Sequence, residues 1–134
     1  MIVVDTNLIV YLIMPTEYTE MASQVFLQDA DWVAPHLWRS EFRNVLAKYL
    51  RQQLVSLPQA QKIMQQAEKV MFENEYGSNS DEVLRLVAGS SCSAYDCEFV
   101  ALAQEFGVPL VTVDKQVLRE FPQTAVSPAT FLIH

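Results

Sequence analysis

The stretch Ile2-Val3-Val4-Asp5-Thr6-Asn7 places a run of aliphatic residues directly before three polar ones. A short apolar run of this kind predicts a buried strand. The polar residues predict the start of a helix, which runs to about Met14 because Pro15 stops it. A similar change occurs at Pro109-Leu110-Val111-Thr112-Val113-Asp114 and predicts a second strand, followed by a short helix over 115–121.

Between these stretches, apolar residues recur with the spacing of a helix face, as at Phe42, Val45 and Leu46. Gly107 predicts the end of the helix that precedes it. Because strands alternate with helices, we expect an α/β fold with a mainly parallel sheet, built as a single domain over residues 1–134. The other predicted elements are helices over 16–28, 36–51, 58–72, 80–88 and 93–106, strands at 32–34 and 125–126, and a loop over 73–79.

Composition and charge exclude several classes of protein. The apolar fraction of 51% argues against intrinsic disorder, and the longest apolar run, Leu8 to Met14, is far too short to cross a bilayer. No Lys or Arg precedes Arg39, so we expect no signal peptide. Two cysteines are too few for a disulfide framework, which favours a cytoplasmic protein. The net charge of −7 argues against a basic nucleic-acid coat protein but is compatible with an enzyme that reaches phosphates through metal ions.

Two acidic residues follow predicted strands directly. Asp5 comes after the first strand, and Asp114 comes after Thr112-Val113. If the strands are parallel, both carboxylates lie at the carboxyl edge of the sheet, where sites form in α/β proteins. The alternative is that each Asp only caps the helix that follows it.

Two further acids lie on the apolar faces of predicted helices. Asp96 precedes Phe99 by three residues, and Glu41 precedes Val45 by four. Neither acid has a Lys or Arg three or four residues away, and an acid among apolar residues is unfavourable without a partner. The alternatives are a capping box over Ser93-Ala94-Tyr95-Asp96 and a Glu41 side chain that reaches into water.

Taken together, the four acids predict a metal site. Carboxylates that are crowded together raise one another's pKa, and a divalent cation removes this conflict. A set of oxygen ligands without His or Cys selects a hard ion, Mg²⁺ or Mn²⁺. Such an ion can activate water and stabilise negative charge on a phosphoryl oxygen.

The ordered set of these motifs resembles a known family. The segments that carry the resemblance are Val3–Asn7, Ser40–Leu46, Tyr95–Ala103, Pro109–Lys115 and the tail Val126-Ser127-Pro128. Together they resemble the PIN-domain ribonucleases, and within them the VapC-like toxins of type II toxin–antitoxin systems. The resemblance covers nearly the whole chain.

The resemblance implies a three-layer α/β/α fold and an endoribonuclease that hydrolyses RNA with Mg²⁺ or Mn²⁺. It places the catalytic and metal-binding quartet on Asp5, Glu41, Asp96 and Asp114. It also implies an RNA substrate, a cognate antitoxin protein and a homodimer. Three polar residues beside the quartet are expected to support the site: Thr6, Asn7 and Thr112.

Basic residues on the Glu41 helix are candidates for contacts with the RNA backbone. They are Arg39, Arg43 and Lys48, and the alternative is an ordinary solvated helix face. Residues 72–80 look more elaborate than in a minimal family member.

Two other functions compete with the nuclease. A phosphoacceptor or phosphotransfer domain would also have an Asp after its first strand and a Lys late in the chain, here Lys115. A non-catalytic interaction module would use the four acids only as helix caps. The sequence leaves open which RNA is cut, where it is cut and how many metal ions are bound.

Overall fold

Five short strands form one parallel sheet in the computed structural model, which describes residues 1–133. The strand order is β3-β2-β1-β4-β5, and the sheet is parallel throughout. This confirms the predicted α/β fold. The strands are β1 (Ile2–Val4), β2 (Trp32–Pro35), β3 (Glu75–Tyr76), β4 (Leu110–Val111) and β5 (Ala125–Val126).

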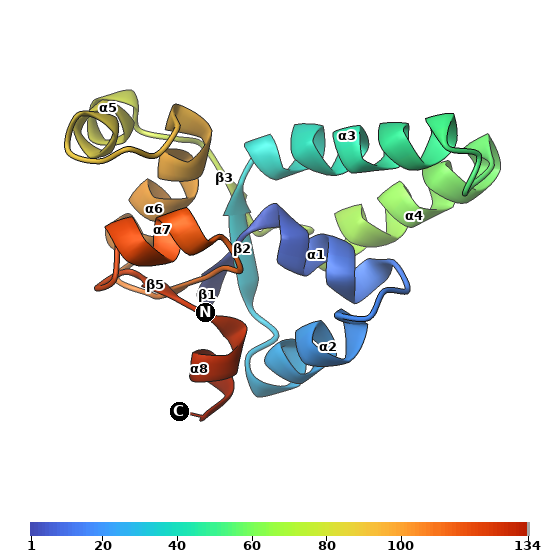
Figure 1. The fold of residues 1–134 in the computed structure, drawn as a ribbon, viewed down its shortest axis with the longest axis horizontal. Helices are drawn as coiled ribbons and strands as arrows, with labels where there is room; N and C mark the ends of the chain where they lie inside the picture. Colours follow the sequence, from blue (N-terminus) through green and yellow to red (C-terminus); the bar gives the residue numbers. More distant parts are fainter. Residues whose placement is uncertain (134) are drawn as a thin grey trace.

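Helices cover both faces of the sheet, which gives the expected three layers (Figure 1). Helices α1 to α4 lie on one side, and α5, α6 and α7 lie on the other, with α6 packed against β1, β2 and β4. Helix α8 packs against α2. The bounds are α1 (Thr6–Ile13), α2 (Thr19–Gln28), α3 (Leu37–Arg51), α4 (Leu57–Val70), α5 (Ser80–Ala88), α6 (Ala94–Phe106), α7 (Lys115–Glu120) and α8 (Pro128–Ile133).

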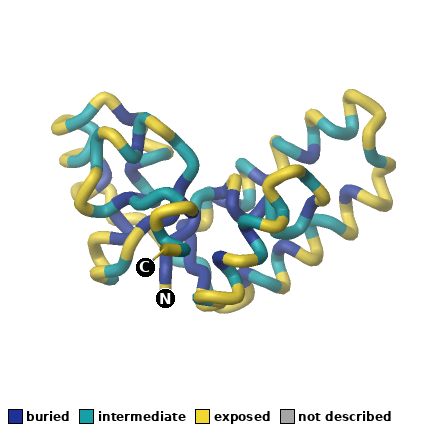
Figure 2. The backbone as a smooth tube through the Cα atoms, turned by 60° about the horizontal axis from the view of Figure 1, so that its bottom comes forward, coloured by how far each residue is buried: buried dark blue, intermediate teal, exposed yellow. Residues whose placement is uncertain are grey.

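The core is centred on β1, which has a neighbouring strand on each side and helices over both faces. Val3 and Val4 are fully buried, as continuous apolar runs in parallel sheets usually are. The indoles of Trp32 and Trp38 are also fully buried. Buried residues follow the sheet through the centre of the molecule, whereas the far end of the α3–α4 pair is largely exposed (Figure 2).

The structure differs from the sequence prediction at three elements. The predicted loop over 73–79 contains the edge strand β3, whose two residues are too short for a recognisable alternation. Helix α2 begins at Thr19 rather than Thr16. The Thr19 hydroxyl accepts a hydrogen bond from the Thr16 amide at 2.8 Å and donates one to the Met14 carbonyl at 2.9 Å, and these bonds hold residues 14–19 in a turn before the helix. Strand β4 covers only two residues of the predicted 109–113.

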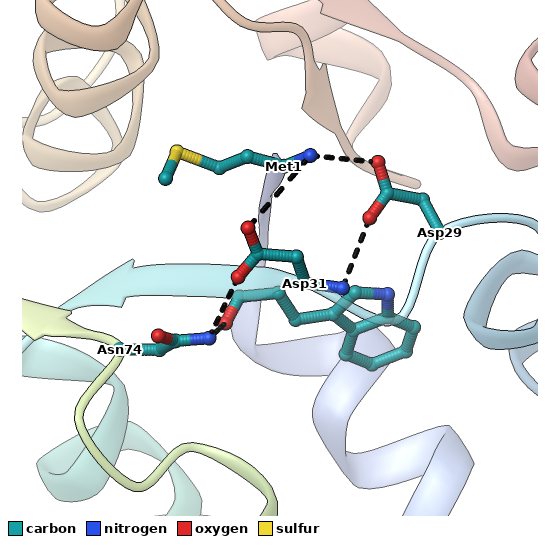
Figure 3. Close-up of polar contacts among 5 residues, drawn as sticks. Met1, Asp29, Asp31 and Asn74 are labelled. Carbon is teal, nitrogen blue, oxygen red and sulfur yellow. Dashed lines mark hydrogen bonds and ion pairs between the residues drawn. The ribbon is translucent and has the colours of Figure 1, made fainter.

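The amino ends of three strands are joined by one polar network (Figure 3). Met1, Asp31 and Asn74 directly precede β1, β2 and β3. The Met1 amino group donates to Asp29 Oδ2 at 2.9 Å, and the Asp31 amide donates to Asp29 Oδ1 at 2.9 Å. Asn74 Nδ2 donates to Asp31 Oδ1 at 3.0 Å and to the Trp32 carbonyl at 2.9 Å. These contacts fix the relative positions of the strands at the edge opposite to Asp5.

The edge strand β3 is attached to α3 through Glu75. This carboxylate accepts hydrogen bonds from Trp38 Nε1 at 2.7 Å, from Arg39 Nε at 2.5 Å and from Arg39 Nη2 at 2.8 Å. Arg39 also pairs with Glu68 on α4. The hydrogen bonds from Arg39 and Trp38 hold the pKa of Glu75 below its ordinary value. An otherwise marginal two-residue strand is thereby stabilised by charged hydrogen bonds.

Within residues 1–133, no helix combines the length and the apolar character that a membrane crossing needs.

Replacing Glu75 with Gln should lower the free energy of unfolding by about 1–2 kcal/mol at neutral pH, because a largely buried charged hydrogen bond is lost. Since folding lowers the pKa of Glu75, its stabilisation is present above the ordinary value of 4.5 and disappears as the pH falls through the lowered value. Urea unfolding of both proteins from pH 3 to pH 7 measures this difference.

The matched control is Glu82→Gln, which removes an exposed pair with Arg85 and should change stability by only a few tenths of a kcal/mol. Equal effects of the two substitutions would contradict a special role for Glu75.

Candidate functional site

Asp5 connects the carboxyl end of β1 to β4. Its Oδ1 accepts the Leu8 amide at 3.0 Å and so caps α1. Its Oδ2 accepts the Thr112 hydroxyl at 2.5 Å and the Val113 amide at 3.1 Å. A carboxylate has about four acceptor positions, and these three donors leave one of them, on Oδ1. Asp5 is therefore a helix cap and, at the same time, a rigidly oriented carboxylate with one remaining acceptor position.

Asp114 is held in the same hydrogen-bond chain. The Asp114 amide donates to Thr112 Oγ1 at 3.0 Å, so that Thr112 links the two acids that follow the strands. Asp114 Oδ1 also caps α7 by accepting the amides of Gln116 and Val117. The capping interpretation of both acids is correct, but it does not exclude a second role.

Glu41 and Asp96 come from helices on opposite faces of the sheet. Glu41 is half-buried on α3, where its Oε1 accepts the Thr6 hydroxyl at 2.7 Å. Asp96 lies in the first turn of α6, and its amide donates to Ser93 Oγ at 3.1 Å. The Ser93 cap that the sequence suggested is thus formed.

One pocket of about 280 Å³ brings the predicted site residues together. Asp5, Glu41, Asp96 and Asp114 all line it. We call it the acidic pocket. No Lys or Arg is among the residues that line it. The supporting residues predicted from the sequence, Thr6, Asn7 and Thr112, line it as well.

Several residues that line the acidic pocket are not marked by the sequence motifs. Asn44 was not proposed, although it lies three residues after Glu41 and therefore on the same side of α3. Phe99 lies three residues after Asp96 in the same way. Helical spacing from each acid could have identified both.

The acidic pocket raises the pKa of three of its carboxyl groups. Burial is the largest cause for Asp5, Glu41 and Asp96. Repulsion adds to it: Asp114 raises the pKa of Asp5 and Asp96, and Asp96 raises that of Glu41. Hydrogen bonds from Thr112 and Thr6 offset part of the effect at Asp5 and Glu41.

The donor set of the acidic pocket fits a hard cation, because it consists of oxygen atoms alone. As the side chains stand, no three His, Cys, Asp or Glu residues within 1–133 are arranged to hold one ion. The pocket is therefore no preformed chelate. It suits an ion that keeps several waters and contacts one or two carboxylates, which is the usual coordination of Mg²⁺.

The three basic residues expected to contact RNA have different surroundings. Arg39 is bound to Glu68 and Glu75, so its guanidinium stabilises β3 and its charge is already paired within the protein. Arg43 and Lys48 are exposed. Neither forms an ion pair with any described residue.

Comparison with known proteins agrees with the fold. The family model described as PIN domain matches residues 2–123. Ribonuclease VapC3 of Pyrobaculum aerophilum is 27% identical over 124 residues, which cover 90% of this chain and 95% of that protein. The crystal structure of PAE2754 from Pyrobaculum aerophilum superposes with a TM-score of 0.77 at 22% identity, covering 98% of this chain and 93% of that one.

Neutralising an acid of the pocket should stabilise the metal-free protein at neutral pH. Glu41→Gln and Asp96→Asn keep the shapes of the side chains and remove repulsion, so we expect gains of roughly 0.5–1 kcal/mol. Because folding raises the pKa of both groups, the wild type loses stability as the pH rises through the raised values. The gain should be absent near pH 4 and grow toward neutral pH in urea titrations with EDTA.

The control is Glu105→Gln, an exposed acid on α6 outside the acidic pocket, which should leave stability nearly unchanged. A loss of stability in both pocket variants at neutral pH would show that the four carboxylates do not repel one another.

Proposed function

The chain belongs to the PIN-domain family, and from this membership together with the acidic pocket we propose that it is a metal-dependent endoribonuclease of the VapC kind. The observation that carries the proposal is the convergence of four acids from separate parts of the chain on one pocket without a basic residue among its lining. The name of the relative, Ribonuclease VapC3, supports RNA as the substrate.

Asp5 and Asp96, with either Glu41 or Asp114, would hold Mg²⁺ or Mn²⁺ directly or through water. When bound, the ion lowers the pKa of a coordinated water and stabilises charge on the phosphoryl oxygens. Thr112 and the Val113 amide prevent Asp5 from rotating, so its remaining acceptor position on Oδ1 keeps a constant direction. This preorganisation is what an electrostatic site requires.

Glu41 is suited to orient the attacking water. The Thr6 hydroxyl holds Oε1, so Oε2 is the oxygen that can accept a proton from a water in the pocket. The new bond joins the water oxygen to phosphorus, and the bond from phosphorus to the 3′ oxygen breaks. A proton passes to the departing oxygen, which leaves products with 5′-phosphate and 3′-hydroxyl ends.

Of Arg43 and Lys48, the two basic residues of α3 proposed to contact RNA that form no ion pair with a described residue, Lys48 is the better placed. It follows Glu41 by seven residues, which places it within about 20° of Glu41 around α3 and about 10 Å farther along the axis. Arg43, two residues after Glu41, lies about 160° away on the other side of the helix. The positions of these residues on α3 therefore favour Lys48 over Arg43.

We further propose that the protein acts as a toxin that forms a homodimer and is blocked by a cognate antitoxin. The net charge of −7 suits a partner with a basic segment. Leu54 and Leu57, at the far end of the α3–α4 pair, are 63% and 59% exposed and offer apolar contact area to a protein partner.

Incubation with total RNA and Mn²⁺ tests the nuclease directly. The wild type should cut RNA to leave 5′-phosphate ends, and Asp96→Asn should reduce the rate at least 100-fold, whereas Glu105→Gln should cut normally. Mn²⁺ should also raise the melting temperature of the wild type and not that of Asp96→Asn. The absence of both cleavage and a thermal shift would indicate a non-catalytic interaction module instead.

Lys48→Ala should weaken binding of single-stranded RNA and reduce the slope of log K against log salt concentration by about 0.7 to 1. Arg43→Ala is the matched control, because it removes one exposed charge from the same helix. Fluorescence anisotropy at several salt concentrations measures both slopes. Equal slopes for the two variants would contradict the proposed path of the RNA along α3.

A further inference from the structure

A second hollow lies beside the acidic pocket, between the first turns of α3 and α6. It has a volume of about 200 Å³ and is lined by Leu37, Ser40, Glu41, Asn44 and Tyr95. We call it the side hollow. Glu41 and Asn44 line both spaces, so the side hollow adjoins the acidic pocket, where the phosphodiester would react.

Tyr95 is the aromatic residue of the side hollow. It directly precedes Asp96 on α6, and 63% of its surface is exposed. Its ring stacks on no other aromatic ring among residues 1–133. Its hydroxyl forms none of the hydrogen bonds within this part of the chain. The side chain therefore contributes little to folding, and its largely exposed ring lines the same hollow as Glu41, an acid of the site.

The lining of the side hollow suits a flat, uncharged ring. Leu37 and Tyr95 provide apolar surface, and Ser40 and Asn44 provide hydrogen-bonding groups. The Glu41 carboxylate would repel a phosphate group there. The volume is below the roughly 300 Å³ at which pockets begin to hold drug-sized ligands, so it fits one small ring system.

We propose that the side hollow binds the nucleobase adjacent to the scissile phosphate, with Tyr95 stacking on that base. This inference rests on the proposed ribonuclease function and adds a positioning residue to it. Base–aromatic stacking is tolerant of sequence because every base has a flat face. Stacking also orders the nucleotide, which places its phosphate over the acidic pocket.

The test is equilibrium binding of two labelled probes, each about 12 nucleotides long, a length usual for single-strand binding sites. One probe is oligoadenylate, and the other is a ribose-phosphate chain of the same length without bases. Ca²⁺ replaces Mg²⁺ as the hard divalent ion in the titrations. We expect Tyr95→Ala to weaken binding of oligoadenylate roughly 5- to 100-fold and to leave binding of the abasic probe unchanged.

Two variants control for other causes. Tyr95→Phe keeps the flat ring and should bind oligoadenylate like the wild type. Phe72→Ala removes an aromatic ring that is even more exposed and lies outside both spaces, and it should have no effect. Unchanged binding in Tyr95→Ala, or an equal loss with both probes, would overturn the inference.

Cleavage assays separate this inference from the proposed function. If the wild type cuts no RNA but Tyr95→Ala loses affinity only for the probe with bases, the result supports base binding in the side hollow and contradicts the proposed nuclease function. If the wild type cuts RNA and Tyr95→Ala binds and cuts normally, the result supports the proposed nuclease function and contradicts base binding in the side hollow.

Discussion

The hydrogen bonds from Thr112 and Val113 to the Asp5 carboxylate are the contacts on which the site depends. They join the carboxyl ends of β1 and β4, which are distant in sequence but adjacent in the sheet. The same carboxylate begins α1 through Leu8. Because three donors surround it, a buried acid is tolerated where an isolated one would be unfavourable. A single side chain therefore contributes to strand pairing, to the helix start and to the geometry of the site.

The two edges of the sheet differ in how their acidic groups are partnered. At the amino edge, the Met1 ammonium pairs with Asp29, and hydrogen bonds connect Asp29, Asp31 and Asn74. At the carboxyl edge, four acids face one pocket without a basic residue in its lining. The first arrangement stabilises the fold, whereas the second opposes folding in the absence of a cation. This contrast is typical of a functional site, where groups are held in positions that stability alone would not select.

Helix α3 has a distinct role on each of its faces. Trp38, Phe42 and Leu46 pack into the core, and Arg39 attaches β3 through Glu75. Glu41 lies at the edge of the buried face and lines both the acidic pocket and the side hollow. The contact between Arg39 and Glu75 thus holds the helix that carries Glu41. A substitution in β3 that removes this contact would therefore be expected to shift Glu41, although β3 does not line the acidic pocket.

The sequence by itself determined the alternation of strands and helices and the four acids, because both are written in local patterns of apolar and charged residues. The end of α6 at Gly107 was also predictable, because a glycine adopts the observed φ of 64° without strain. Only the tertiary structure decided the place of β3, because this two-residue strand is held by the hydrogen bond from Arg39 to Glu75, which are 36 residues apart in the sequence. It likewise separated Arg39, which is engaged in ion pairs, from Arg43 and Lys48, because local spacing does not reveal which carboxylates come near in space. The proximity of Asp5 and Asp114 was predictable from parallel strand order, but the positions of Glu41 and Asp96 and the side hollow depend on how α3 and α6 lie against the sheet.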